Sequence, residues 1–229
     1  MFVKLGLLPE KVNITLNYNL YKGYIFELAL TNQYIFMKSI LFFLLIICSV
    51  QVSAQTYPEG LNVNDVAPDF TGINQIGKKI NLKKQLRNGN VVLVFYRGQW
   101  CSFCNKQLKQ LEDSLALIKG KGATVLAITP ELPENISLSI RRTNASYPIL
   151  YDEGLKIMNA YKVAYKEDDQ ALKKYRGDGI NILEANGNNG ANLPVPAVYI
   201  INKKGKITYR FFDINYTKRS SVKDILDHL

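Results

Sequence analysis

The fold is decided in the stretch Val91-Val92-Leu93-Val94-Phe95-Tyr96-Arg97-Gly98-Gln99-Trp100-Cys101-Ser102-Phe103-Cys104. Its first six residues form an apolar, largely β-branched run, which predicts a strand that is buried on both faces. A short turn with Gly98 follows, and a Cys-x-x-Cys pair then opens an expected helix. Backbone amides and the helix dipole stabilise negative charge at a helix N-terminus, so a thiol placed there ionises more readily. The stretch therefore indicates thiol chemistry.

On both sides of this stretch, the pattern of apolar residues and turn signals predicts an alternation of strands and helices. A hairpin over 67–82 turns near 74–78, and the remaining expected strands are 91–96, 123–128, 147–151, and a hairpin over 198–212. The expected helices are 101–119, 133–144, 154–161, 166–176 and 220–229, and the glycine- and asparagine-rich segment 186–192 is expected to be a flexible loop. This order predicts an α/β fold, a three-layer α/β/α sandwich with an N-terminal hairpin. Its first strands pair in parallel, and the terminal hairpin adds an antiparallel edge.

The first 54 residues are set apart from this fold. Residues 37–54 contain a lysine, a short apolar run and small residues that end at Ala54, the order of a secretory signal peptide. Residues 1–36 are then an upstream extension that does not belong to the folded protein, and 55–229 form a single domain. The apolar run is shorter than the roughly 20 residues of a membrane-spanning helix. The alternative to a cleaved signal peptide is an uncleaved signal that anchors the protein in the membrane. A contact with the membrane is expected only in that case. The protein is thus expected to be exported, to the periplasm or cell envelope if the organism is Gram-negative.

The charge of the chain gives little support to a nucleic-acid partner. Lys and Arg number 29 against 19 Asp and Glu, a formal net charge of +10, but the basic residues are spread in pairs along the chain. We find no basic stripe interleaved with aromatic residues, which is the pattern of a nucleic-acid surface. A basic protein has only a weak general preference for acidic partners or membrane surfaces.

The cysteine pair has three possible uses. Two thiols one helical turn apart can cycle between dithiol and disulfide, and a redox role for Cys101 and Cys104 is the favoured interpretation. A structural staple is the second, although a bridge that closes so short a loop restrains the unfolded chain little. Metal binding is the third, but a tetrahedral zinc site needs four ligands and the domain offers two cysteines and His228. Asn105 stands where c-type haem attachment requires histidine, so no cofactor and no metal are expected.

Several motifs together resemble those of a known family. From about Val66 onward the sequence resembles the alkyl hydroperoxide reductase C and thiol-specific antioxidant (AhpC/TSA) family, and within it the peroxiredoxin-like subgroup with Arg-Gly-x-Trp-Cys-x-x-Cys. The matching segments are 67–70, 95–104, 193–197, and Asp213-x-x-Tyr216 followed by Arg219. The resemblance implies a thioredoxin-like fold. It also implies that Pro196 corresponds to the cis-proline beside the redox-active cysteines. Pro194 competes for the same role, and an ordinary turn or edge-strand proline is the alternative.

The resemblance also exposes a conflict inside the motif. Peroxiredoxins carry Pro-x-x-x-Thr-x-x-Cys after the strand, and the same spacing here places Arg97 at the proline, Cys101 at the threonine and Cys104 at the attacking cysteine. The family also implies an arginine on a later strand that binds the peroxide. That strand begins here at 196–199 and contains no arginine, so Arg97 is a candidate replacement charge. Thioredoxin-like logic instead makes Cys101 the attacking and more exposed sulfur, with Trp100 covering the pair. Which cysteine attacks is left open by the sequence.

The cysteine pair together with this resemblance implies an antioxidant enzyme, a thioredoxin-dependent thiol peroxidase of the peroxiredoxin type. It would reduce hydrogen peroxide or organic hydroperoxides through a Cys101–Cys104 dithiol–disulfide cycle, with a thioredoxin-like protein as reductant. The expected site comprises Cys101 and Cys104, supported by Arg97, Trp100 and Pro196. The alternative is a thiol–disulfide oxidoreductase that acts on protein disulfides. A non-catalytic thioredoxin-fold protein that binds a metal such as copper is less favoured, because copper-delivery relatives use a wider cysteine spacing and a histidine on a later loop.

Overall fold

The computed structural model describes residues 57–229 without a break and, upstream, residues 22, 24, 27, 28, 33–38 and 42. The chain divides into two units, Met1–Gln55 and Thr56–Leu229, and the described residues of the first are helical. Apart from residues 37, 38 and 42, the predicted signal peptide lies outside the described residues, so the assignments of 1–36 and 37–54 stay predictions. None of the helices within the described residues combines the length and apolar character needed to cross a membrane.

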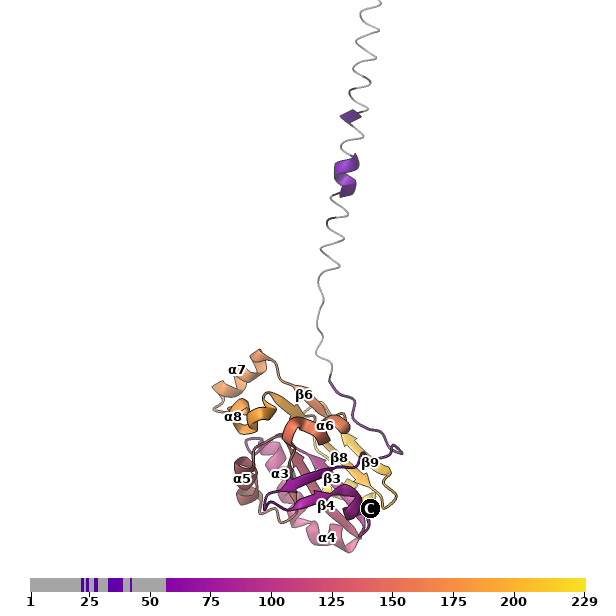
Figure 1. Ribbon diagram of the computed structural model, residues 1–229, viewed down its shortest axis with the longest axis vertical. Coiled ribbons are helices and arrows are strands. Elements are labelled where there is room, and N and C mark those ends of the chain that lie inside the picture. Colours follow the sequence, from indigo (N-terminus) through magenta and orange to yellow (C-terminus); the bar gives the residue numbers. More distant parts are fainter. Residues whose placement is uncertain (1–21, 23, 25–26, 29–32, 39–41, 43–56) are drawn as a thin grey trace, which may run out of the picture. The chain divides into compact units, whose positions relative to one another are not determined.

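The domain from residue 57 onward is built on one seven-stranded sheet with helices on both faces (Figure 1). In chain order its elements are β1 (Thr71–Asn74), β2 (Lys79–Asn81), α2 (Leu82–Leu86), β3 (Asn90–Phe95), α3 (Ser102–Asp113), α4 (Leu115–Gly120), β4 (Ala123–Thr129), α5 (Pro133–Thr143), β5 (Ile149–Tyr151), α6 (Lys156–Ala160), β6 (Ala164–Lys166), α7 (Asp169–Gly177), α8 (Ile182–Asn186), β7 (Asn192–Pro194), β8 (Ala197–Ile201), β9 (Ile207–Phe212) and α9 (Val222–Asp227).

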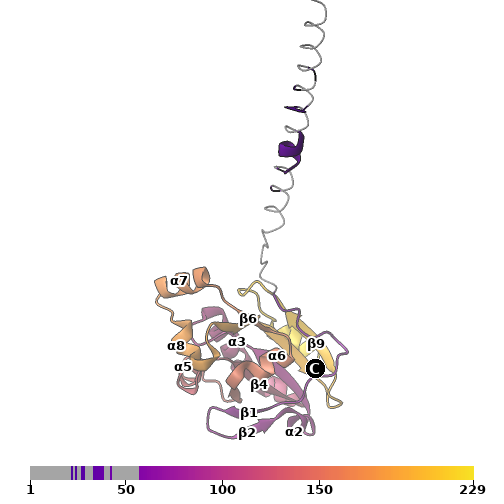
Figure 2. The ribbon, with the colours of Figure 1, turned by 45° about the horizontal axis from the view of Figure 1, so that its top comes forward.

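The strand order of the sheet is β2-β1-β5-β4-β3-β8-β9. β3, β4 and β5 pair in parallel, and β8 and β9 continue the sheet from β3 as an antiparallel hairpin. The N-terminal hairpin joins the opposite edge, because β1 pairs with β5 (Figure 2). The predicted parallel strands, the hairpins at both ends and the α/β class are confirmed.

The central strand β3 explains why the sheet has three layers. From Val91 onward its residues are fully buried and alternate between two cores. Val91, Leu93 and Phe95 pack with residues of α2 and α6, whereas Val92 and Val94 pack with residues of α3, α4, α5 and α9. Alternation with a period of two on a strand that is buried on both faces is what the continuous apolar run predicted.

Two predicted elements differ from the structure. The helix expected over 101–119 is divided at Ser114, whose φ of −106° and ψ of 6° lie outside the helical range, and α3 and α4 lie on either side. A serine that competes for backbone hydrogen bonds favours such a helix end.

The prediction of a flexible loop at 186–192 is wrong. The segment contains the end of α8, a 3₁₀ turn and the start of β7, and Asn186 and Asn189 are buried. The Asn189 side-chain amide donates to the carbonyl oxygens of Pro130 at 2.8 Å and Asp152 at 3.0 Å. This buried amide is satisfied by the loops that follow β4 and β5, so the segment is fixed rather than loose.

Candidate functional site

The cysteine pair lies where β3 ends and α3 begins. Cys101 is the N-cap of α3, and its Sγ accepts a hydrogen bond from the Cys104 backbone N at 3.3 Å. The two sulfurs form a disulfide, with the Cα atoms 5.2 Å apart. The prediction that the pair opens a helix is confirmed. Cys101 is 4% exposed and Cys104 is fully buried, so the expected difference in accessibility exists but is small.

Arg219 is the cation that contacts the sulfurs. Its Nη2 lies 3.0 Å from Cys104 Sγ and 3.6 Å from Cys101 Sγ. It comes from the segment 213–221 between β9 and α9, and its Nη1 donates to the backbone carbonyls of Tyr216 and Lys218. Burial, followed by the charge of nearby Arg97, lowers the pKa of Arg219 to about 10, which leaves it protonated near neutral pH. A thiolate on either sulfur would have a charge-assisted partner here.

Arg97, considered above as a replacement charge for the cysteines, lies in a cluster of aromatic and acidic side chains. Its guanidinium is almost fully buried, donates to the Tyr175 hydroxyl and lies 3.6 Å from the Glu167 carboxylate. It also stacks 4.3 Å from the centroid of the Tyr216 ring and 4.8 Å from that of Trp100. Among the described residues, the cation within hydrogen-bond distance of the sulfurs is thus Arg219, and Arg97 holds the surrounding segments together.

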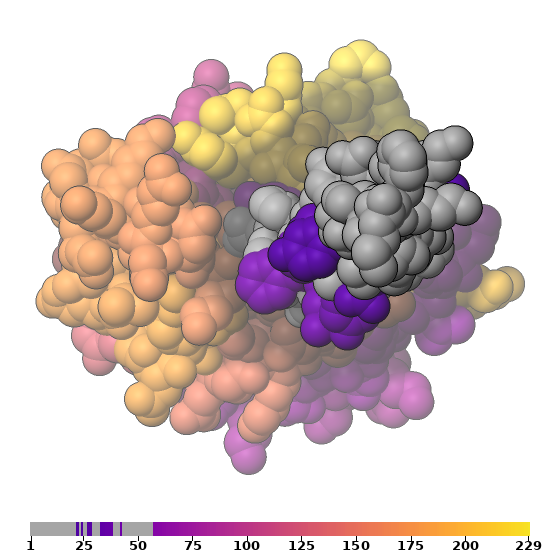
Figure 3. All heavy atoms as spheres, turned by 90° about the horizontal axis from the view of Figure 1, so that it is seen from above, coloured from indigo at the N-terminus to yellow at the C-terminus, as the bar shows by residue number. Residues whose placement is uncertain are grey.

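Those segments include the α7–α8 lobe, residues 169–186, which lies at one side of the domain in Figure 3 (orange). Trp100 packs against the small apolar cluster of this lobe, and its ring centroid is 5.3 Å from that of Tyr175 in α7. Arg97 and Trp100 therefore connect the turn before Cys101 to the lobe, while Tyr216 connects the same guanidinium to the segment that carries Arg219.

Glu131 is a site residue that the sequence analysis missed. It is fully buried just after β4, and its carboxylate accepts a hydrogen bond from the Gln99 backbone N at 2.7 Å. A Cβ at Gly98 would lie 2.6 Å from Glu131 Oε1 and 2.5 Å from Trp100 Nε1, so the turn needs glycine there. The signal was present in the chain, because Glu131 follows the strand that pairs in parallel with β3, and such strand ends meet at one edge of a sheet.

Glu131 gives the domain a pH-dependent stability. Burial raises its pKa to about 8, against smaller opposing effects of the Gln99 hydrogen bond and the Arg142 charge. The folded protein thus holds a proton that the unfolded chain loses above its ordinary pKa of 4.5. The resulting stabilisation is complete below that value and is lost as pH rises toward 8, with a slope of at most about 1.4 kcal/mol per pH unit.

We therefore expect Glu131→Gln to remove this slope, because glutamine stays neutral and can still accept from Gln99. The free energy of unfolding of the variant relative to wild type should rise steadily between pH 5 and pH 8. Urea unfolding at several pH values measures it, and Glu153→Gln, at an exposed carboxylate, is the matched control. Parallel pH profiles for wild type and Glu131→Gln would contradict the assignment.

Pro196 does not reproduce a cis-proline. Every peptide bond among the described residues is trans, which corrects the expectation from the resemblance. The trans isomer is the favoured state of an X–Pro bond by about 0.5–1 kcal/mol, and the backbone on both sides is already fixed. The Val195 N donates to the Val163 carbonyl at 2.8 Å, and the Pro196 carbonyl accepts from the Asp213 N at 3.4 Å. Pro196 is a buried link between β7 and β8.

No group of three or more potential metal-ligating side chains occurs within the described part of the chain. His228 lies at the C-terminal end of α9, where its ring is 4.5 Å from that of Tyr209.

The AhpC/TSA family matches residues 63–210, which include the cysteine pair and most of the sheet. The chain belongs to the AhpC/TSA family. The resemblance in the sequence is confirmed, and with it the thioredoxin-like fold class.

Relatives of the chain carry two kinds of name. The thiol-disulfide oxidoreductase ResA of Bacillus cereus is 25% identical over 150 residues, 65% of this chain and 69% of that protein. Peroxiredoxin Bcp of Escherichia coli (strain K12) is 25% identical over 162 residues, 71% of this chain and 92% of that protein.

Solved structures share the fold at low identity. Peroxidoxin BcpB from Mycobacterium tuberculosis has a TM-score of 0.57 at 17% identity, over 73% of this chain and 96% of that one. A putative protein disulfide isomerase from Bacteroides thetaiotaomicron has a TM-score of 0.53 at 19% identity, over 75% of this chain and 91% of that one. The chain is similar to proteins of both kinds.

Proposed function

We propose that this chain is a thiol peroxidase that reduces hydrogen peroxide or organic hydroperoxides through Cys101 and Cys104. The proposal rests on the position of the Arg219 guanidinium, which lies 3.0 Å from Cys104 Sγ. Cys104 in turn forms a disulfide with Cys101. An opposite charge at that distance favours the thiolate, which is the nucleophilic form of cysteine. Peroxiredoxin Bcp and ResA support an enzyme of thiol oxidoreductase type.

The reaction divides into two displacement steps. The Cys104 thiolate attacks one peroxide oxygen, the O–O bond breaks, and the other oxygen leaves as water or an alcohol after taking up a proton. The product is a sulfenic acid on Cys104. The Cys101 thiol then attacks the Cys104 sulfur, an S–S bond replaces the S–O bond, and water leaves. We assign the attack to Cys104 because Arg219 lies closer to it than to Cys101.

The cycle closes when a dithiol reductant supplies two electrons and two protons. A thioredoxin-like protein is the proposed reductant, and it would attack Cys101, which is the more exposed sulfur. Two exposed aromatic side chains support a protein partner at this place. Phe103 and Tyr216 are 41% and 44% exposed, and their ring centroids are 6.3 Å apart. Aromatic residues are enriched at the centres of protein interfaces.

The proposal is tested with the full chain carrying Cys48→Ser, so that Cys101 and Cys104 are the remaining thiols. The fully reduced protein receives one equivalent of hydrogen peroxide or cumene hydroperoxide. We expect loss of both thiols and formation of the Cys101–Cys104 disulfide, seen by intact mass and peptide mapping. Protein alkylated with iodoacetamide is the control. Unchanged thiols after the peroxide is added would contradict the proposal.

Thiol–disulfide exchange on other proteins is the second candidate, favoured by Trp100 directly before the Cys-x-x-Cys pair and by the similarity to ResA. Reduction of insulin by the reduced protein measures it. Insulin reduction faster than peroxide reduction would make exchange the main activity.

Export to the periplasm or cell envelope is also part of the proposal, on the strength of the segment 37–54. A mature chain that begins at Gln55 is the expected result of N-terminal sequencing, and a chain that retains residues upstream of it contradicts cleavage after Ala54.

A further inference from the structure

A pocket lies at the end of the sheet opposite the cysteines. The turn between β8 and β9 lies near the start of β3, because Val91 pairs with Ile201, whereas the cysteines follow the end of β3. The six residues of β3 separate the two places by about 20 Å. The pocket is bounded by this turn, by α2 and by the segment 66–69, and has a volume of about 560 Å³. That volume is in the range of small-molecule sites.

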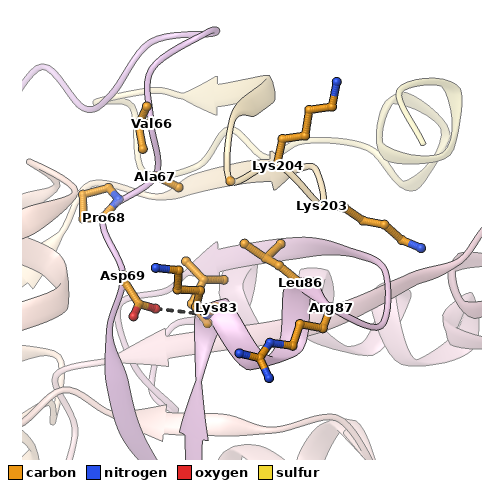
Figure 4. Close-up of a pocket in the computed structure, with 11 residues that line it drawn as sticks. Val66, Ala67, Pro68, Asp69, Lys83, Leu86, Arg87, Lys203 and Lys204 are labelled. Atoms are coloured by element: carbon orange, nitrogen blue, oxygen red, sulfur yellow. Dashed lines mark hydrogen bonds between the residues drawn. The ribbon is translucent and has the colours of Figure 1, made fainter.

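The pocket combines an apolar interior with a basic rim. Apolar residues of its lining include Leu82 and Leu86 of α2, which are buried, and Val66, which is 70% exposed. Lys83 and Arg87 extend from α2 on one side, and Lys203 and Lys204 from the β8–β9 turn on the other (Figure 4). None of these four side chains forms an ion pair with a described residue.

The acidic residue that lines the pocket is already engaged. The Asp69 carboxylate accepts from the Lys83 backbone N at 3.0 Å and from the Asn81 Nδ2 at 3.2 Å, which directs it to the start of α2. Four cations against one engaged carboxylate leave a positive potential over an apolar surface. Anions with an apolar part are the ligands that such a surface complements.

The walls of the pocket are fixed before any ligand binds. The Ala67 N donates to the Gly205 carbonyl at 2.9 Å, and Val66 forms a bridge with Lys206. Asn202 Oδ1 accepts from the backbone N of Lys204 at 3.0 Å and of Lys206 at 3.1 Å, which fixes the turn that carries the two lysines. A pocket with a fixed backbone loses less conformational entropy when it is occupied.

We propose that this pocket binds a small organic anion, a phosphate or carboxylate attached to an apolar group. The anionic group lies at the rim lined by Lys83, Arg87, Lys203 and Lys204, and the apolar group packs against Val66 and Pro68, the accessible apolar residues of the lining. The site is separate from the cysteines, so ligand binding does not depend on peroxide chemistry. A free metabolite and the headgroup region of an anionic lipid both present this chemistry.

The test is isothermal titration of the full chain with phenyl phosphate, inorganic phosphate and phenol. The variant is Arg87→Gln/Lys203→Gln/Lys204→Gln, and the matched control is Lys173→Gln/Lys174→Gln/Arg176→Gln on α7, which also removes two exposed lysines and one exposed arginine. We expect phenyl phosphate to bind at least about tenfold more tightly than either fragment, and the variant to lose at least about tenfold in affinity while the control stays near wild type. A thermal unfolding curve that matches that of wild type shows that the variant is folded.

Binding to vesicles of phosphatidylcholine with and without phosphatidylglycerol distinguishes an anionic lipid from a free metabolite as the ligand. If wild type and control bind both phenyl phosphate and anionic vesicles and the variant binds neither, the result supports the site and indicates a lipid ligand. Phenyl phosphate binding without vesicle binding supports a free metabolite. Equal affinity for phenyl phosphate and inorganic phosphate, equal losses in variant and control, or vesicle binding without phenyl phosphate binding would overturn the proposal.

Discussion

Cys104→Ser is expected to reduce peroxide consumption to the rate without protein, whereas Cys101→Ser is expected to retain one turnover. Cys104 is the sulfur nearest the Arg219 guanidinium, so its thiolate is the better stabilised and attacks the peroxide. Without Cys101 the sulfenic acid has no neighbouring thiol to close a disulfide. It should persist as one added oxygen per chain, which intact mass measures after one equivalent of peroxide in the Cys48→Ser background.

Trapping with dimedone distinguishes this sulfenic acid from oxidation at methionine, since only the sulfenic acid reacts. Both variants keep a short side chain at the start of α3, so near-native unfolding curves are expected and serve as the control. One added oxygen on the Cys104→Ser chain, with an unreacted Cys101→Ser chain, would reverse the assignment and make Cys101 the attacking sulfur.

The second large effect is expected from Arg219→Ala. Removal of a cation about 3 Å from Cys104 Sγ lowers the fraction of thiolate at neutral pH, and the pH at which the rate is half-maximal should rise by about 1–2 units. The second-order rate constant for peroxide at pH 7 should fall about 10–100-fold. Stopped-flow kinetics between pH 5 and pH 9 measure both quantities, and Arg219 itself stays protonated in that range because its pKa is about 10.

Arg219→Lys should recover part of the rate, because it keeps the charge but cannot contact both sulfurs and the backbone carbonyls together. Arg141→Ala removes an exposed arginine of α5 and is the matched control for net charge. A pH profile for Arg219→Ala that falls in height without moving along the pH axis would show that Arg219 does not stabilise the reacting thiolate.

The centre of the fold and the cysteine pair could be predicted because their signals are local. The apolar run 91–96 and the Gly98 turn are contiguous, and the start of α3 at Ser102 follows from residues next to it in the chain. The alternation of β3 between two cores likewise follows from the absence of polar residues in the run. Such features depend on the period of the strand and on turn chemistry, which a sequence contains directly.

The rest of the site depends on contacts between distant segments. Arg219 was noted as part of a motif, but its contact with Cys104 spans 115 residues and depends on how the chain returns after β9. Glu131 was missed because its signal, the parallel pairing of β4 with β3, depends on the separate segment 90–95 rather than on its neighbours in the sequence. Asn189 was misassigned because asparagine and glycine indicate loops unless a buried amide finds carbonyl partners. Arg97 was predicted as a candidate charge, and its place among three aromatic rings could not be inferred from spacing.

The buried Arg97 guanidinium has a consequence for how the protein matures. It contacts Trp100 before the cysteines, Tyr175 in α7 and Tyr216 near the end of the chain, so these parts are brought together by one side chain. The cysteines are synthesised long before Arg219, the residue that contacts both sulfurs. During synthesis the two thiols therefore lack this cation, and they acquire it only when the segment 213–221 docks.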